Sequence, residues 1–175
     1  MELDEDYEDT VPSEKGDVFI AINKCLDILE SDSVTDSEKS FYLKLLIHFI
    51  GDLHQPMHIG RYEDRGGNRV YVKWFGRNSN LHRVWDSEMI NGYNMSYSEL
   101  AKNLPTPEKL EIEFERDDVI GWVNEIHSYT RNIYKDVSSG DNLGYEYQYK
   151  NFPTVKDLIL KGGLRLAALL NYLFD

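Results

Sequence analysis

The segment HFIGDLHQPMH, residues 48–58, contains three of the five histidines of the chain. Within it His48 and Asp52 are four residues apart, a spacing that places both side chains on one face of an α-helix, about one turn apart. The residue before Pro56 is a position where helices usually end. We therefore expect His58 to lie just past the helix, where it can turn back toward the other two side chains.

A second pair with the same spacing, His82 and Asp86, lies in NLHRVWD, residues 80–86. Asn80 is a good N-cap and predicts that a helix carries this pair. One pair alone is more often a surface or capping feature than a metal site. Two pairs together with His58 favour a metal site. Mixed imidazole and carboxylate ligands suit zinc best, and iron and manganese stay possible.

Composition predicts one globular domain. The 175 residues are 41% hydrophobic and 13% aromatic, enough to build a core. No stretch of eighteen apolar residues predicts a membrane span, and the opening MELDEDYEDT is acidic, unlike a secretory signal. Cys25 is the only cysteine, so no internal disulfide can form, and its neighbours predict a buried helix thiol.

The formal net charge of −12 argues against a polyphosphate partner, but the charge is unevenly distributed. Between Arg61 and Arg83 six basic residues stand against two acidic ones, a local balance of +4. A solvated loop and strand surface explains this cluster as well as a phosphate-binding surface does. Bound divalent ions would add positive charge of their own.

The spacing of the hydrophobic residues, together with residues that start or end helices, predicts the remaining elements. Thr35 and Glu38 resemble a capping box, and His127 is a lone histidine on a predicted helix, usually a structural residue. The expected elements are a lead-in at 1–15 that is extended or poorly ordered, a helix of about three turns from Asp17, a helix from Thr35 to Gln55, a turn at 64–68, a strand or hairpin arm at 69–75 ended by Gly76 and Asn78, a short segment at 98–104, a long helix at 117–136 and a final helix from Pro153.

Five segments carry recognisable motifs: HFIGDLHQPMH, DRGGN (64–68), NLHRVWD, KGDVFIAI near the start and GGLRLAALLN near the end. Together they closely resemble the zinc-dependent nuclease family of fungal and plant single-strand-specific nucleases, which are relatives of zinc-dependent phospholipase C. The resemblance implies a mostly α-helical bundle of the phospholipase C/nuclease type, with a short β-hairpin between metal-binding helices and three zinc ions in a cleft. Residues 1–175 then form a single nuclease-like domain.

The resemblance assigns site residues position by position. His58, His82 and Asp86 match the three protein ligands of one zinc, and that set is complete. His48 matches a ligand of a second zinc. Asp52 matches the carboxylate that bridges the second zinc to a third, which makes it the catalytic candidate.

Asn68 matches the asparagine of the family's GGN motif, close to the cleft, and is the substrate-binding candidate. The family's other ligands, an N-terminal Trp, a following His, and a later Asp and His, have no match in residues 1–47. We therefore expect the chain to correspond to the C-terminal two thirds of a family member, without the family's N-terminal segment.

The activity implied by the resemblance is zinc-dependent hydrolysis of single-stranded DNA or RNA to 5′-nucleotides, with 3′-nucleotidase activity, in a secreted or periplasmic protein. Unpaired bases would stack on aromatic side chains, for which Tyr62, Tyr71, Trp74 and Phe75 are candidates. Two alternatives stay open: a phospholipase C-like phosphodiesterase, and a non-catalytic fragment that binds one zinc.

Overall fold

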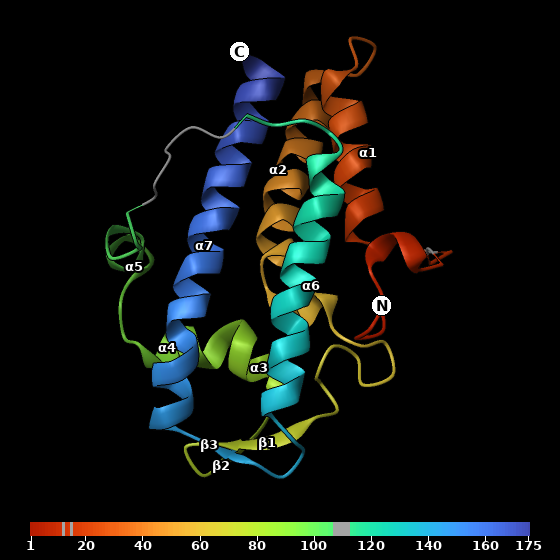
Figure 1. Ribbon diagram of the computed structural model, residues 1–175. Coiled ribbons are helices and arrows are strands. Elements are labelled where there is room, and N and C mark those ends of the chain that lie inside the picture. The colour runs from red at the N-terminus through yellow and green to blue at the C-terminus, as the bar shows by residue number, and fades with distance from the viewer. Residues whose placement is uncertain (12, 15, 107–112) are drawn as a thin grey trace.

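The computed structural model describes residues 1–11, 13–14, 16–106 and 113–175. Helices dominate, and one small sheet closes an end of the molecule (Figure 1). The elements are η1 (Tyr7–Asp9), α1 (Val18–Glu30), α2 (Asp36–Leu53), η2 (Pro56–Ile59), β1 (Tyr71–Trp74), β2 (Arg77–Asn80), α3 (Leu81–Arg83), η3 (Val84–Glu88), α4 (Met89–Gly92), α5 (Tyr97–Lys102), α6 (Asp118–Asp136), β3 (Asn142–Leu143) and α7 (Tyr145–Phe174).

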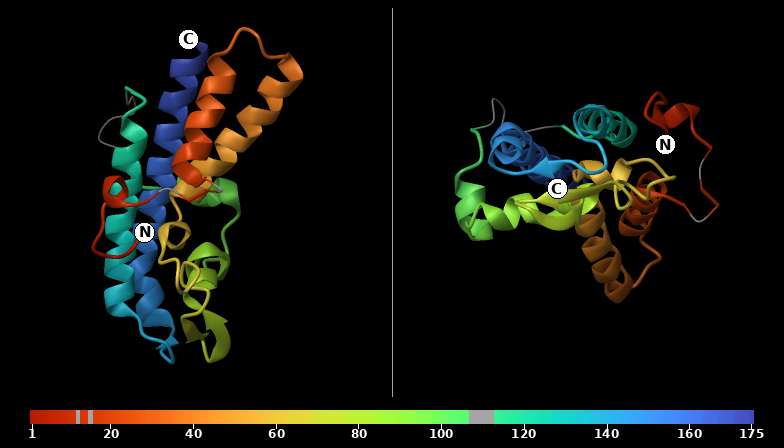
Figure 2. Two further views of the ribbon diagram at one scale, coloured as in Figure 1. Left: turned by 90° about the vertical axis from the view of Figure 1, so that its right-hand side faces the viewer. Right: turned by 90° about the horizontal axis from the view of Figure 1, so that it is seen from below.

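The two longest helices, α6 and α7, run side by side, with α1 and α2 toward one end of the bundle and the sheet at the other (Figure 1). Seen from the side, α2 leans away from the long helices at the end where α1 joins it (Figure 2). The expected mostly α-helical bundle with a β-hairpin between the two metal-motif helices is confirmed. Within the described ranges, no helix is both long and apolar enough to cross a membrane.

Local signals placed several helix starts correctly. The Asp17 side chain accepts a hydrogen bond from Ile20 N at the start of α1. Thr35 and Glu38 form the expected capping box at the start of α2. Asn80 accepts from Arg83 N and so caps α3. The apolar residues Ile22, Leu26 and Leu29 of α1 are buried together with Cys25, which is a free thiol.

The hairpin arm predicted at 69–75 is present as β1, but it ends earlier than expected. Phe75 and Gly76 form a two-residue turn with φ of 48° and 77°, and Asn78, expected to end the strand, lies inside β2. The antiparallel β1–β2 pair runs from Tyr71 opposite Asn80 to Trp74 opposite Arg77. The parallel partner β3 was not predicted, because two residues carry no periodicity.

The final helix begins before the predicted start at Pro153. Proline removes one backbone hydrogen bond from a helix and costs about 3 kcal/mol in its interior. Here α7 passes through Pro153 because its first turns are held by tertiary contacts. The Trp85 indole donates to Tyr147 Oη at 2.8 Å, and Tyr93 stacks on Phe152 with ring centroids 4.0 Å apart.

The acidic lead-in packs against α6 and contains the short helix η1. Tyr7 N donates to Asn124 Oδ1 at 2.8 Å, and Arg131 pairs with Asp6 at the same distance. The expectation of an extended segment holds for part of it. Residues 12 and 15 lie outside the described residues.

Two hydrophobic clusters make up the core, and the metal motif lies between them. Met57 is buried in the cluster that includes the sheet residues and Trp85, whereas Ile59 is buried in the cluster formed by α1, α2 and α6. Both residues belong to η2, the short helix that follows α2. His58 lies between them in sequence, so its backbone is fixed from both sides.

The DRGGN turn packs against η2 at a distance that only glycine permits. Gly66 has a φ of 62°, and a Cβ at this position would lie 2.2 Å from Met57 O. Buried Asp64 holds the turn, because its carboxylate accepts from Gly67 N at 2.7 Å and from Tyr134 Oη at 2.8 Å. Arg61 donates to the same carboxylate at 2.7 Å.

A polar network lies behind the C-terminal end of α2. His54 Nδ1 lies 2.7 Å from Ile50 O, and its Nε2 lies 3.0 Å from Arg165 Nη1. Because a guanidinium only donates, Nε2 must accept, and His54 is neutral with its proton on Nδ1. Burial lowers the pKa of His54 to about 4, and the charge of Arg165 acts in the same direction.

We expect Gly66→Ala to destabilise the protein more than Gly76→Ala. Both glycines have positive φ, which costs alanine about 1–2 kcal/mol, but only Gly66 faces a backbone atom within contact distance. Overpacking adds about 1–3 kcal/mol at Gly66. Urea unfolding of both variants measures the difference. Equal losses of unfolding free energy would show that the close approach to Met57 does not constrain the turn.

We expect the stability of the fold to fall on acidification, in part through His54. Its pKa of about 4 in the folded state lies below its ordinary value of 6.5, so the unfolded chain takes up a proton first as the pH falls. Between pH 7 and pH 5 the wild type should lose about 2 kcal/mol more unfolding free energy than His54→Gln. Denaturant titrations of both proteins at the two pH values test this. Equal losses of unfolding free energy in the two proteins would contradict this prediction.

Candidate metal centre

The fold brings the five predicted residues together in one connected set. His48 Nε2 lies 3.1 Å from Asp52 Oδ2, across one turn of α2. His58 Nδ1 lies 3.5 Å from Asp52 Oδ1, and His58 Nε2 lies 3.4 Å from Asp86 Oδ1. His82 stacks on His58 with ring centroids 5.2 Å apart. Side chains from α2, η2, α3 and η3 therefore meet at one place.

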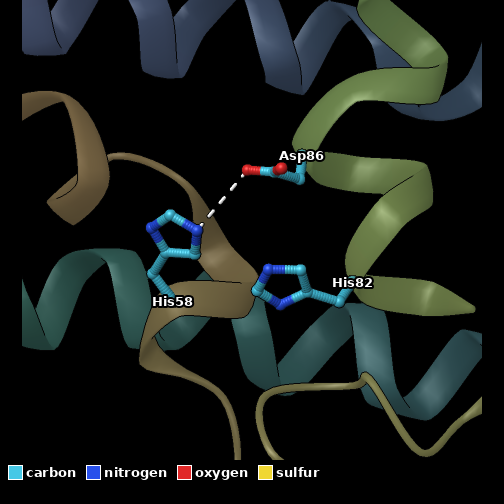
Figure 3. Close-up of side chains that lie close together, drawn as sticks. All are labelled: His58, His82 and Asp86. Atoms are coloured by element: carbon cyan, nitrogen blue, oxygen red, sulfur yellow. Dashed lines mark ion pairs between the residues drawn. The ribbon is translucent and has the colours of Figure 1, made fainter.

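Three of these side chains form a compact donor group. One donor atom each from His58, His82 and Asp86 lies within 4.8 Å of the other two. Figure 3 shows the three side chains pointing toward one another, His58 from one segment and the other two from the helix that faces it. Within the described residues, no other group of three such side chains is this close.

A backbone carbonyl orients His82. Its Nδ1 lies 2.8 Å from Gly66 O, which can only accept, so the ring proton is on Nδ1. Nε2 is then the ring nitrogen that can bind a metal ion. A histidine ligand usually donates its other N–H in this way, which fixes the ring and raises the basicity of the ligand atom.

The second pair lies on a helix that begins at Leu81, as predicted, but this helix is not α-helical throughout. After α3, the chain continues as the π-helical segment η3, in which Met89 N bonds to Val84 O. Asp86 is the third residue of this segment. The wider turn keeps His82 and Asp86 on the same side of the chain. Such π segments are rare and occur frequently at functional sites.

The chemistry of the donor set fits a zinc ion, and one distance within the set matches zinc coordination. Two donors on one tetrahedral zinc lie about 3.4 Å apart, given bond lengths of about 2.1 Å. His58 Nε2 and Asp86 Oδ1 are separated by 3.4 Å. Two nitrogens and one carboxylate oxygen make a three-ligand site with a free fourth position, as catalytic zinc sites have. Partial exposure of all three residues leaves that position open to solvent.

A cleft of about 830 Å³ opens in front of His58 and His82. Its walls come from α1, α2 and the segment that leads from η2 through the DRGGN turn. The lining includes Asp17, Phe49, Asp52, Arg61, Tyr62, Glu63, Arg65 and Arg69. The basic cluster predicted from sequence thus contributes three arginines to this cleft.

The other proposed substrate residues differ in their placement. Tyr62 is 87% exposed and lines the cleft. Trp74 is only 9% exposed and belongs to the core, so it cannot stack on a base. Tyr71 and Phe75 are exposed on the hairpin. Asn68 is exposed, and its side-chain amide donates to Arg65 O at 2.9 Å within the same turn.

A second, apolar hollow of about 370 Å³ lies on the other side of the donor group, between α2 and α7. Asp52 and His58 line both hollows. The walls of the second hollow include Ile47, Ile159 and Leu166. The donor group therefore lies where a polar cleft and an apolar hollow meet.

Some supporting residues could not be found from sequence. Asp64 and Tyr134 are seventy positions apart, and only folding brings the hydroxyl to the carboxylate. Burial and the neighbouring Asp64 raise the pKa of Tyr134, so the hydroxyl stays protonated and donates. The paired glycines of DRGGN predicted a turn, but not the carbonyl that it directs at His82.

His127 lies outside the donor group. It is fully buried in α6, with Nδ1 3.3 Å from Ile59 O and Nε2 3.0 Å from Glu2 O. These contacts tie α6 to η2 and to the lead-in. The residue therefore has a structural environment, as expected for a lone helix histidine.

Comparison with known proteins agrees with the resemblance of the motifs. Residues 2–175 match the S1/P1 Nuclease family model. Endonuclease 4 of Arabidopsis thaliana is 34% identical over 164 residues, covering 83% of this chain and 54% of that protein. Nuclease S1 of Aspergillus oryzae is 30% identical over 164 residues, with 80% and 56% covered. Nuclease P1 of Penicillium citrinum is 38% identical over 99 residues, with 53% and 36% covered.

The chain thus spans about half the length of the curated relatives it matches. The family match, in contrast, extends over nearly all of this chain and includes both His/Asp pairs and the glycine turn. The chain belongs to the S1/P1 nuclease family.

Proposed function

We propose that the protein is a zinc-dependent phosphodiester hydrolase that cleaves single-stranded DNA or RNA to 5′-nucleotides and has 3′-nucleotidase activity. The observation that carries the proposal is the group of three donors, His58, His82 and Asp86, beside a cleft lined by arginines. Family membership and relatives named endonucleases support the same activity.

His58, His82 and Asp86 would hold one zinc ion. A bound zinc ion supplies a Lewis acid for a phosphate oxygen and lowers the pKa of bound water toward neutrality. The hydrogen bond from His82 Nδ1 to Gly66 O keeps Nε2 free to bind. Gln55 Nε2 reaches Asp86 Oδ1 at 3.5 Å and helps to aim that carboxylate.

His48 and Asp52 would supply donors to a second site. Asp52 lies between two imidazoles, with one oxygen facing each ring. It also lines the cleft, so a carboxylate oxygen can accept the proton of an attacking water. We assign Asp52 the catalytic role on this basis. Three zinc ions in the whole protein would need further donors beyond the five residues of this cluster.

Single-stranded nucleic acid suits the cleft chemically. The cleft lining includes basic side chains that suit a phosphate backbone, and the exposed ring of Tyr62 offers a stacking surface for an unpaired base. Asn68 remains the candidate for substrate contact, and the hydrogen bond from its side-chain amide to Arg65 O holds it in the turn. Secretion or export to the periplasm is part of this proposal and fits what the family resemblance implies.

A second candidate is a domain that binds one zinc and does not catalyse. It is favoured by one observation: among the described residues, His48 and Asp52 are not joined by a third donor into another compact group. A zinc content of one per chain, without turnover of any phosphodiester, would support this candidate over the nuclease.

We expect Asp86→Ala and His82→Ala to lose the zinc bound by the three-donor group. Asp32→Ala is the matched control, because it removes an exposed carboxylate from the loop between α1 and α2. Metal analysis of the purified proteins, with thermal unfolding to verify folding, gives the answer. Zinc retained at the wild-type level in the folded Asp86 variant would refute the ligand assignment.

We expect chelation to abolish cleavage of single-stranded DNA and added zinc to restore it, since the proposed chemistry depends on the metal. The assay compares an oligonucleotide and phosphatidylcholine vesicles side by side as substrates of the purified protein. Turnover of the lipid alone would favour the phospholipase C-like alternative. Undiminished cleavage in excess chelator would rule out the metal mechanism.

A further inference from the structure

Arg65 has an unusual backbone conformation at the edge of the cleft. Its φ is 57°, a left-handed value that costs a residue with a side chain about 1–2 kcal/mol. Among the described residues, only Phe75 and Asn94 share this feature without being glycine. Phe75 is explained by the hairpin turn and Asn94 by the tolerance of asparagine. Strain of this kind clusters at ligand-binding positions.

The backbone of Arg65 is held firmly in this conformation. Its N–H donates to Tyr62 O at 3.1 Å, and its carbonyl accepts from the Asn68 side-chain amide at 2.9 Å. The next residue, Gly66, is packed against Met57 O and holds His82. The Arg65 side chain therefore extends from an anchor that is rigidly connected to the metal ligands.

The guanidinium of Arg65 differs from its neighbours in having no protein partner within the described part of the chain. Arg61 is paired with Asp64 and Glu63, at 2.7 Å and 3.2 Å. Arg69 donates to Glu63 O at 2.9 Å. Arg65 lines the same cleft as His58 and His82 and is exposed. It is thus a free cation beside the donor group, in a chain with a net charge of −12.

We propose that Arg65 binds a backbone phosphate of the nucleic-acid strand next to the phosphodiester held at the donor group. The inference rests on the proposed function. A guanidinium can bind a phosphate through two parallel hydrogen bonds. A 3′-mononucleotide has only the phosphate that reacts, so Arg65 contributes to the binding of a strand and not to that of a mononucleotide. It is a specificity-determining residue for polynucleotides.

The test compares Arg65→Gln with Arg77→Gln in zinc-loaded protein. Both changes remove one exposed positive charge, but Arg77 lies on the hairpin and does not line the cleft. Binding of a fluorescent oligothymidylate with cleavage-resistant phosphorothioate linkages is followed by anisotropy over a range of salt concentrations. Arg65→Gln should weaken binding about tenfold and reduce the salt slope by about 0.7, the value for one phosphate of a single strand.

Two further variants separate binding from structure. Arg65→Gly relieves the left-handed strain, so it should be at least as stable as the wild type and still lose oligonucleotide affinity. Arg65→Lys should keep the salt slope, because the charge stays. For cleavage, KM for the oligonucleotide should rise about tenfold in Arg65→Gln, while kcat/KM for a 3′-mononucleotide stays unchanged.

The outcomes distinguish this inference from the proposed function. A wild type that binds the oligonucleotide but shows no zinc-dependent cleavage would refute the nuclease function, while the salt slopes would still decide the role of Arg65. An unchanged slope in Arg65→Gln, or an equal loss in Arg77→Gln, would overturn the role of Arg65 alone. A wild type that does not bind the oligonucleotide would overturn both.

Discussion

The hydrogen bond between His82 Nδ1 and Gly66 O is the contact on which the candidate metal centre depends. It exists because Gly66 can approach Met57 O to a distance that no side chain allows. Met57 is in turn fixed in the core next to His58. One glycine therefore sets the positions of two members of the donor group, His82 through a backbone carbonyl and His58 through packing. Imidazole orientation is determined here by main-chain geometry, which tolerates little movement.

Much of the fold follows from local sequence signals. The caps at Asp17, Thr35 and Asn80 place helix starts correctly, because a cap and its partner lie within three residues of each other. The pairing of His48 with Asp52 was predictable for the same reason. Elements decided by distant contacts were not predictable. The start of α7 before Pro153 depends on Trp85 and Tyr93, which lie some sixty positions earlier in the chain.

The site itself was predictable only in part. The spacing of His82 and Asp86 suggested a common helix face, and the side chains do converge, but through a π-helical segment that no pattern signalled. Asp64 and Arg65 are sequence neighbours with opposite roles: one is buried and holds the turn, whereas the other is exposed in the cleft. Only the fold assigns these roles, because the alternation of charge is compatible with a solvated loop.

Several unusual backbone conformations of the described residues lie close to the donor group. The π-helical segment at Asp86 and the left-handed Arg65, Gly66 and Gly67 all lie within the segment from η2 to η3. Hydrogen bonds within the protein hold them in place. Asn80 caps α3, the Asp64 carboxylate accepts from Gly67 N, and Gly66 O accepts from His82 Nδ1. A small metal-dependent domain forms its site only as the metal binds, and that binding supplies the folding free energy. Here the donors are held by the two hydrophobic clusters and by the hydrogen bonds just named, so a metal ion bound by them would not be opposed by the cost of ordering them.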